Sequence, residues 1–271
     1  MMNFNEKCHK LTNLMENYTK NDVVIAFSGG VDSSLLLKLA SESAKLNKTK
    51  VYAVTFHTKL HPVKEKDFTA EIAKKHGVIH KIIEIDELRE AGIEENPKER
   101  CYLCKKHMFS RLKDYAKTVG VKVIIEGTNH DDLGMYRPGI RAIAELGILS
   151  PLADVCMTKE EVRKMAKAHS VSASNKPSTP CLATRFEYGM KLDYEEIKKV
   201  EKAEEYIRSL GFYNVRLRVH GKIARIEVDS SDIPLLVNKK DDIILFVKEL
   251  GFLYVTLDLE GFVSGSMDRI L

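Results

Sequence analysis

Short apolar runs alternate with amphipathic stretches along the first half of the chain. Apolar runs of strand length predict β-strands, and apolar residues that recur every three or four positions predict helices. The expected elements are a helix at 4–18, a strand at 23–27, a helix at 32–46, a strand at 51–56, a helix at 62–76, a strand at 79–84, a mostly helical section at 86–119, a strand at 121–126 and a helix at 158–169. This alternation predicts an α/β fold with a doubly wound parallel sheet, whose ligands bind at the carboxyl ends of the strands.

The pattern changes at residues 170–192, where small, polar and proline residues dominate and predict a long functional loop. Beyond the loop we expect a helix at 193–210, strands at 214–219 and 222–228, helices at 230–236 and 239–250, and a strand at 252–257. The chain is therefore expected to have a large domain at 1–170, a cysteine-bearing active-site loop at 171–192 and a smaller C-terminal α/β domain at 193–271.

Composition places the chain among ordinary soluble proteins. Its 271 residues are 44% hydrophobic and 30% charged. We find no apolar run of the roughly 20 residues that cross a bilayer and no signal-peptide core near the N-terminus, so we expect a cytoplasmic protein without membrane contact. The net charge of +4 suits small anionic substrates and does not require nucleic acid.

The most informative stretch is Ala26–Ser34, which reads Ala-Phe-Ser-Gly-Gly-Val-Asp-Ser-Ser. It connects an expected strand to the N-terminus of an expected helix, where backbone N–H groups and the helix dipole attract anions. Its two glycines allow a tight turn, and its serines add hydroxyl donors. Asp32 alone would repel phosphate, so its presence indicates Mg²⁺. The phosphate-binding lysine of the nucleoside-triphosphatase loop is missing.

The hexapeptide Ser28–Ser33 resembles the PP-loop of ATP pyrophosphatases. In that superfamily a substrate oxygen attacks the α-phosphorus of ATP, AMP is joined to the substrate, and pyrophosphate leaves. The resemblance implies an adenine nucleotide α-hydrolase-like fold, and the alternative is a glycine turn that binds no ligand. The residues expected at ATP and Mg²⁺ are Ala26, Ser28, Gly29, Gly30, Asp32, Ser33, Thr55 and Gly127. Of these, Ala26 and Thr55 are expected at the ends of adjacent strands, beside the nucleoside.

Five cysteines in a chain expected in the cytoplasm indicate metal or redox chemistry before disulfides. Cys101 and Cys104 form a Cys-x-x-Cys pair, Cys181 lies alone in the long loop, and Cys8 and Cys156 are expected to be buried or half-buried. The pair by itself fits a redox couple, half a zinc site or part of an iron–sulfur site. Three thiolates could hold a 4Fe–4S cluster with one open iron, provided that Cys181 folds back onto the pair.

Several segments together resemble the LarE family of ATP-dependent sulfur transferases, which act in the biosynthesis of the nickel-pincer cofactor of lactate racemase. The segments are 28–33, 96–105, 126–132, 136–139, 150–152, 176–185 and 215–219, and they extend over nearly the whole chain. The resemblance implies a small-molecule substrate, pyridinium-3,5-dicarboxylate mononucleotide, whose carboxylates are adenylated and converted to thiocarboxylates. It also implies a homo-oligomer.

The family obtains its sulfur in two ways. In one, a single cysteine gives up its own sulfur and becomes dehydroalanine, and Cys181 occupies that position here. In the other, this cysteine joins a Cys-x-x-Cys pair to hold a 4Fe–4S cluster, which carries an extra sulfide from sulfide or another sulfur donor. Cys101, Cys104 and Cys181 favour the second route, and sacrifice of Cys181 is the alternative.

The segment 215–220 carries the expected substrate contacts. Strand alternation places Arg216, Arg218 and His220 on one face. Two forked guanidiniums suit a phosphate or a carboxylate, although the pattern alone is also typical of a solvated face. Taken with the family resemblance, it predicts contact with the mononucleotide phosphate. Glu227, on the neighbouring strand, would orient these arginines or bind a metal.

Other polar residues complete the expected site, in which Cys181, Asp32 and Arg185 are the predicted catalytic residues. Candidates for neutralising phosphate charge in the transition state are Arg137, Arg141 and Arg185, and Arg141 could equally be a surface residue. Residues expected either to orient ribose or metal, or to cap the next element, are Asn129, Asp131 and Asp132.

Three other functions compete with sulfur transfer to a mononucleotide. A tRNA thiolase also combines a PP-loop with three cysteines, but it would be expected to show zinc-binding cysteine pairs or a strongly basic RNA surface. An amidating synthetase that uses ammonia leaves the cysteines unexplained. A regulatory nucleotide-binding module without enzymatic activity would need neither the cysteine-bearing loop nor Asp32.

Overall fold

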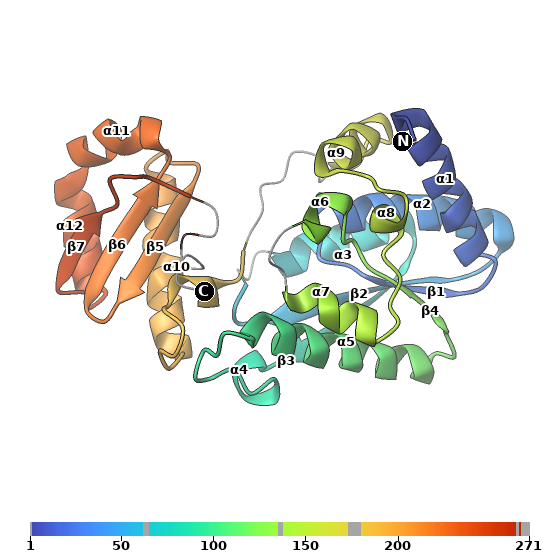
Figure 1. Cartoon of the computed structure of the whole chain (residues 1–271), viewed down its shortest axis with the longest axis horizontal. Helices are drawn as coiled ribbons and strands as arrows, with labels where there is room; N and C mark the ends of the chain where they lie inside the picture. The colour runs from blue at the N-terminus through green and yellow to red at the C-terminus, as the bar shows by residue number, and fades with distance from the viewer. Residues whose placement is uncertain (1, 62–64, 135–137, 173–179, 264–265, 267–271) are drawn as a thin grey trace. The chain divides into compact units, whose positions relative to one another are not determined.

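The computed structural model describes residues 2–61, 65–134, 138–172, 180–263 and 266 (Figure 1). The chain divides into two compact units. The first comprises residues 1–92 and 99–179, and the second comprises residues 93–98 and 180–271. The short segment 93–98 therefore belongs with the C-terminal part of the chain, and the second division falls inside the expected loop.

The first unit is built on a parallel four-stranded sheet in the order β3-β2-β1-β4. The strands are β1 (Val23–Ala26), β2 (Val51–Thr58), β3 (Ile79–Ile85) and β4 (Val123–Ile125). The predicted parallel sheet is confirmed. Its boundaries differ by a few residues: β2 runs two residues longer than expected, and β4 is only three residues long.

Helices cover both faces of this sheet. They are α1 (Phe4–Tyr18), α2 (Val31–Asn47), α3 (Glu65–His76), α4 (Glu87–Glu90), α5 (Arg100–Thr118), α6 (His130–Leu133), α7 (Pro138–Glu145), α8 (Pro151–Asp154) and α9 (Lys159–Ala168). Figure 1 shows α1, α2 and α9 on one side of the sheet and α5 and α7 on the other. No described helix is both long enough and apolar enough to cross a bilayer.

Alternate residues of β1 explain the two layers. Val23 and Ile25 pack with Leu35 of α2 in one hydrophobic cluster, whereas Val24 packs with Phe109 of α5 in the other. Successive side chains of a strand point to opposite faces, so a strand that is apolar at every position needs helices on both sides. This packing confirms the doubly wound architecture.

The second unit is a smaller α/β structure around a three-stranded sheet in the order β5-β6-β7. Its strands are β5 (Val215–His220), β6 (Ile223–Val228) and β7 (Tyr254–Leu257), with β5 antiparallel and β7 parallel to β6. Its helices are α10 (Tyr194–Ser209), α11 (Ile233–Asn238) and α12 (Lys240–Glu249), with 3₁₀ turns η2 (Leu182–Arg185) and η3 (Ser230–Asp232). The helix expected to begin at residue 230 starts as η3 and becomes α-helical only at Ile233.

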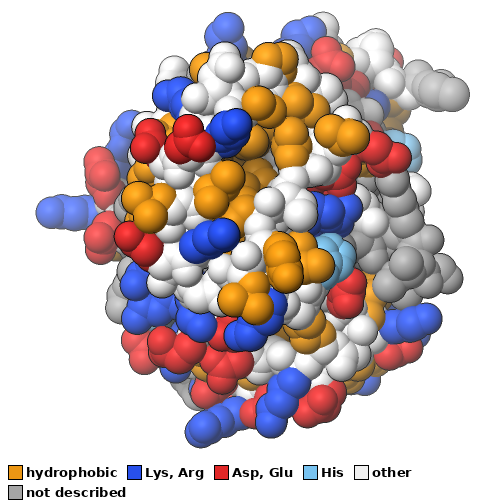
Figure 2. Space-filling model, turned by 90° about the vertical axis from the view of Figure 1, so that its left-hand side faces the viewer, with side chains coloured by type: hydrophobic (Ala, Val, Ile, Leu, Met, Phe, Trp, Pro, Cys, Tyr) orange, Lys and Arg blue, Asp and Glu red, His pale blue; other side chains and the backbone are white. Residues whose placement is uncertain are grey.

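Large exposed hydrophobic side chains are concentrated in the second unit. Eight of them lie there: Tyr213, Ile223, Leu235, Val237, Leu245, Leu253, Tyr254 and Leu259. The described part of the larger first unit has only three, Leu46, Ile79 and Leu133. Figure 2 shows hydrophobic side chains grouped in patches between charged ones on the face that it draws.

Candidate active site

The PP-loop joins β1 to α2 and leaves the N-terminus of that helix open. Gly29 has a φ of +72°, and a Cβ there would lie 2.9 Å from Thr69 and 3.3 Å from Phe68, so the turn requires glycine. Gly30 is the N-cap of α2, and no side chain caps this helix. The first N–H groups of a 17-residue helix are therefore available to an anion.

The polar side chains of the loop are held in place. Ser33 Oγ accepts a hydrogen bond from the Ser28 backbone at 3.3 Å and donates one to the Gly30 carbonyl at 3.2 Å. The two serine hydroxyls lie 3.2 Å apart. Asp32 pairs with the ammonium of Lys159, the first residue of α9, so the carboxylate of the loop already holds a cation. Such a carboxylate beside hydroxyls fits a magnesium-bound triphosphate.

Gly127 and Asn129 bring the end of β4 against the PP-loop. A Cβ on Gly127 would lie 3.1 Å from both the Asp32 Cβ and the Ser33 backbone nitrogen, so glycine is needed for this approach. The buried Asn129 caps α6 by accepting from two backbone N–H groups, and it donates from Nδ2 to Asp32 Oδ1 at 3.3 Å. It therefore caps the next element, one of its two expected roles, and it also steadies the carboxylate of the loop.

The two residues expected beside the nucleoside lie on adjacent strands. Ala26 ends β1, and Thr55 lies on β2 with its hydroxyl donating to the Phe27 carbonyl at 2.8 Å. The same hydroxyl lies 2.9 Å from Nε2 of His80, whose pKa is lowered by burial. The Thr55 hydroxyl is thus engaged within the sheet, and contact of this residue with the nucleoside stays a prediction.

The three cysteines expected to bind iron are divided between the units. Cys101 and Cys104 lie three residues apart near the start of α5, where Cys101 is exposed and the Cys104 sulfur is 3.5 Å from the Met108 sulfur. Cys181 precedes η2 in the second unit. Among the described residues no three His, Cys, Asp or Glu side chains form a metal-binding group. Cys8 is half-buried, as expected, whereas Cys156, also expected to be buried or half-buried, is exposed in a left-handed turn after α8.

Arg185 is buried and fully engaged inside the second unit. Its Nε and Nη2 donate to the Glu204 carboxylate at 2.7 and 3.1 Å. Its Nη1 donates to the Cys181 carbonyl at 3.3 Å and to the Thr184 hydroxyl at 2.7 Å. Burial alone would raise the pKa of Glu204, but the charges of Arg185 and Arg208 and its hydrogen bonds hold that pKa below the usual value. Arg185 therefore fixes the backbone at Cys181.

Arg218 is also saturated by its neighbours. Its Nε and Nη2 donate to the two oxygens of the buried Glu227 at 3.0 and 2.9 Å. It also donates to the Thr184 carbonyl at 2.9 Å and to the Ser266 hydroxyl at 3.1 Å. The register pairs Glu227 with Arg216, so the Glu227 carboxylate reaches Arg218 diagonally across the hairpin. Glu227 thus orients one arginine of the strand.

Arg216 differs from Arg185 and Arg218, which each pair with a buried carboxylate. It is 8% exposed, donates to the Val215 carbonyl at 2.7 Å, and lies 5.0 Å from the centre of the Phe262 ring. In the part of the chain that the structure describes, no carboxylate lies within ion-pair distance of it. Burial, followed by repulsion from Arg185, lowers the pKa of Arg216 to about 10, which leaves it charged at neutral pH. A buried guanidinium without a carboxylate is unfavourable, so this position is suited to an anionic ligand.

The sequence of this chain is similar to those of known proteins. Residues 4–178 match the family of the PP-loop domain. The chain is 37% identical to the pyridinium-3,5-bisthiocarboxylic acid mononucleotide synthase of Lactiplantibacillus plantarum, over 92% of this chain and 90% of the relative. The chain belongs to the LarE family of PP-loop enzymes. It is an ATP-dependent sulfur transferase.

Two uncharacterized proteins are similar to this LarE chain over both of its units. An uncharacterized protein of Synechocystis sp. is 38% identical over 97% of this chain and 98% of its own length. An uncharacterized protein of Methanocaldococcus jannaschii is 36% identical over 97% of this chain and its full length. The relationship therefore extends through the arginine-bearing strand β5 as well as the PP-loop.

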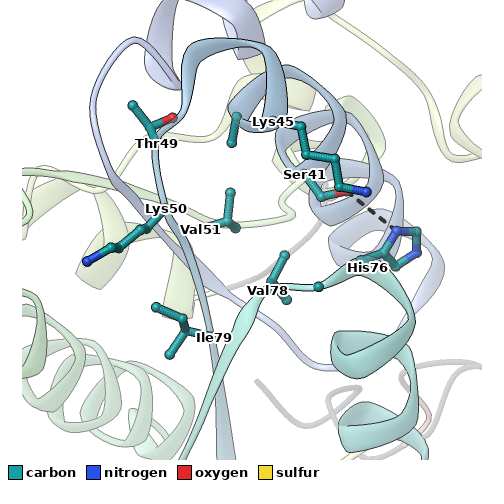
Figure 3. A pocket seen from close by; sticks show the side chains of 10 residues that line it. Ser41, Lys45, Thr49, Lys50, Val51, His76, Val78 and Ile79 are labelled. Atoms are coloured by element: carbon teal, nitrogen blue, oxygen red, sulfur yellow. Dashed lines mark hydrogen bonds between the residues drawn. The ribbon is translucent and has the colours of Figure 1, made fainter.

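A pocket of about 110 Å³ lies at the end of the parallel sheet that is opposite to the PP-loop, near the amino ends of β2 and β3. Figure 3 shows Lys45, Ser41 and His76 around it, with the Ser41 hydroxyl 3.4 Å from His76 Nδ1. Burial and three nearby lysines lower the pKa of His76. Since ligands of doubly wound sheets bind at the carboxyl ends of the strands, we do not assign this pocket to ATP.

The remaining predicted residues lie in different surroundings. Arg137 falls outside the described residues. Arg141 lies 3.8 Å from the centre of the Tyr102 ring and 3.5 Å from Glu145, in an exposed network. This placement agrees with the surface alternative stated for it. His220 pairs through Nδ1 with Glu187.

Asp131 and Asp132 take part in helix ends. The Asp131 carboxylate accepts from the backbone N–H of Lys159 at 2.8 Å, and Asp132 completes the capping box of α6. Both residues therefore cap helices, which is one of the two roles expected for them.

Sequence reasoning missed two residues of the site. Glu204 lies in a helix dense with exposed charges, so nothing in its pattern distinguishes it from a solvated glutamate. Lys159 begins a helix 127 residues after Asp32, and only the packing of α9 on α2 brings the two together. A signal was present for Lys159, because a lysine in the first turn of a helix is electrostatically unfavourable.

Proposed function

We propose that this LarE enzyme adenylates the carboxylates of pyridinium-3,5-dicarboxylate mononucleotide and converts them to thiocarboxylates. The observation that carries the proposal is the buried Arg216, which has no carboxylate within ion-pair distance among the described residues and so suits the phosphate of a mononucleotide. It lies in the same unit as Cys181. The relative from L. plantarum is named for the bisthiocarboxylic acid mononucleotide that it makes.

The PP-loop would supply activation. The open N-terminus of α2 and the serine hydroxyls hold the terminal phosphates of ATP, and Asp32 holds Mg²⁺. Magnesium neutralises phosphate charge when it is bound. A substrate carboxylate oxygen attacks the α-phosphorus and the bond to pyrophosphate breaks. A sulfur nucleophile then forms the carbon–sulfur bond, and AMP leaves with the oxygen.

The second unit would supply specificity. Arg216 binds the substrate phosphate, while Arg218, already paired with Glu227, positions the strand. Arg185 acts on Cys181 through the backbone carbonyl and not on a phosphate, because Glu204 occupies its guanidinium. These roles refine the expected assignments of Arg185, Arg216, Arg218 and Glu227.

Sulfur would be carried by a 4Fe–4S cluster on Cys101, Cys104 and Cys181. The placement of the pair supports this donor set, because Cys101 and Cys104 share one face at the start of α5, as cluster ligands require.

Iron content and the activity of cysteine variants distinguish the cluster route from the sacrificial route. Anaerobically reconstituted enzyme should contain about four irons per chain and absorb broadly in the visible range. Changing Cys101, Cys104 or Cys181 to Ala should remove both the iron and sulfur transfer. As a matched control, C156A should retain both. Loss of activity in C181A alone, with Cys181 of the wild type converted to dehydroalanine after turnover, would establish the sacrificial route instead.

The choice of acceptor tests the function itself. Pyrophosphate release should depend on the pyridinium dicarboxylate mononucleotide, and the product should be a thiocarboxylate by mass spectrometry. Release that responds instead to bulk tRNA, or to a carboxylate acceptor with ammonia, would replace the proposal with a thiolase or an amidating synthetase. Tight ATP binding with no release on any acceptor would indicate a regulatory module.

The homo-oligomer and the external sulfur donor stay predictions. We expect the oligomer to use the exposed hydrophobic side chains of the second unit as its contact surface.

A further inference from the structure

Lys159, the first residue of α9, connects this helix to the PP-loop through an ion pair with Asp32. Its ammonium pairs with one oxygen of Asp32, and the Asn129 amide donates to the other at 3.3 Å. The Lys159 side chain is 39% exposed and that of Asp32 is 17% exposed. Both oxygens of the PP-loop carboxylate are thus engaged by residues from outside the loop.

The backbone of Lys159 is fixed, so only its side chain is able to move. Thr158 and Glu161 form a capping box at the start of α9. The Lys159 N–H donates to Asp131 at 2.8 Å. Val162 and Met165 of the same helix pack in the hydrophobic cluster that contains α2. This support holds the flexible four-carbon side chain of a lysine beside the phosphate loop.

The local electrostatics disfavour a lysine here. The N-terminus of α9 carries partial positive charge, and the open N-terminus of α2 adds more beside Asp32. The carboxylates of Asp131 and Glu161 accept backbone N–H groups at the start of α9, whereas the Lys159 ammonium forms its ion pair with Asp32. A residue that breaks a local rule in this way is expected at a functional site, and the ligand expected at a PP-loop carries several negative charges.

We propose that Lys159 and Mg²⁺ exchange places on Asp32 when MgATP binds. Without nucleotide, Lys159 neutralises the carboxylate. When MgATP arrives, Asp32 takes the magnesium ion of the substrate, and the Lys159 ammonium transfers to phosphate oxygens, because two cations on one carboxylate repel each other. There Lys159 stabilises the charge that develops on the leaving pyrophosphate.

This exchange rests on the proposed magnesium role of Asp32, and it does not depend on the sulfur acceptor. Two binding measurements on Lys159→Met test it. Binding of Mn²⁺ to the nucleotide-free protein, followed by electron paramagnetic resonance, should tighten about fivefold because Asp32 loses its competing cation. Binding of α,β-methylene ATP, followed by calorimetry, should weaken about tenfold or more because a charged phosphate contact is lost.

Two further variants control the result. Lys159→Arg should keep most of the affinity for the ATP analogue, and Lys167→Met, in the exposed last turn of the same helix, should match the wild type in both measurements. Unchanged affinity of Lys159→Met for the ATP analogue would overturn the phosphate contact. Unchanged affinity for Mn²⁺ would overturn the competition on Asp32. If Lys159→Met shows both changes in affinity but the wild type does not transfer sulfur to the mononucleotide, the proposed function is contradicted and the exchange on Asp32 still holds.

Discussion

The two units prepare for anionic ligands in different ways. The first offers the uncapped N-terminus of α2 and one partly exposed ion pair, Asp32 with Lys159. The second buries its charges. Three buried guanidiniums, on Arg185, Arg216 and Arg218, lie near two buried carboxylates, on Glu204 and Glu227.

The difference indicates that the first unit binds the phosphates common to all PP-loop enzymes and that the second unit selects the substrate. A site made from backbone N–H groups binds the phosphates that every PP-loop enzyme uses, and it needs few particular side chains. A buried charge is unfavourable unless it is paired, so each guanidinium of the second unit needs a partner. Two have a bidentate carboxylate and Arg216 has none, which singles out Arg216 as the position for the specific ligand.

The largest expected effect comes from breaking the paired part of the buried cluster. Glu204→Gln removes the charge that compensates Arg185 and Arg208, and it should lower the free energy of unfolding by about 3–5 kcal/mol. Urea denaturation followed by circular dichroism measures this, since the chain has no tryptophan. Glu205→Gln, at an exposed position of the same helix, should change it by less than about 0.5 kcal/mol. Equal effects of the two variants would show that the Glu204 pair contributes no more than a surface charge.

A smaller and opposite effect is expected at the unpaired arginine. Arg216→Met removes a desolvated charge that has no carboxylate, so the free energy of unfolding should stay the same or rise by about 1 kcal/mol. Arg218→Met is the matched control, and it should lose about 3 kcal/mol because the buried Glu227 loses its bidentate partner and keeps only the longer ion pair with Arg225, at 3.4 Å. The same urea titrations compare the two. Similar losses in both variants would mean that Arg216 is a structural residue.

The sheet and the PP-loop could be predicted because their signals are local. The apolar runs of β1 and β2 are continuous, and the loop and the start of α2 occupy consecutive residues. Arg216 and Arg218 could be placed on one face from strand alternation alone. Their different roles could not, because the contact between Glu227 and Arg218 is diagonal across a hairpin whose register the sequence does not reveal.

Long-range packing accounts for the other residues that were missed. Glu204 is buried because α10 packs against β5, where the Glu204 carboxylate also accepts the Leu217 N–H at 3.0 Å. Segment 93–98 lies far from the C-terminal part in sequence, yet the Asn96 side chain and backbone join it to residues 186–189. No periodicity within either segment indicates such contacts.

The most direct test of the division between the units is the pyrophosphate release of wild type and Arg216→Met with two acceptors. One is the pyridinium dicarboxylate mononucleotide and the other is the same nucleoside without phosphate. The wild type should prefer the mononucleotide by about 100-fold in kcat/KM, and the variant should lose that preference while its KM for ATP is unchanged. A variant that still prefers the phosphorylated acceptor would contradict the account.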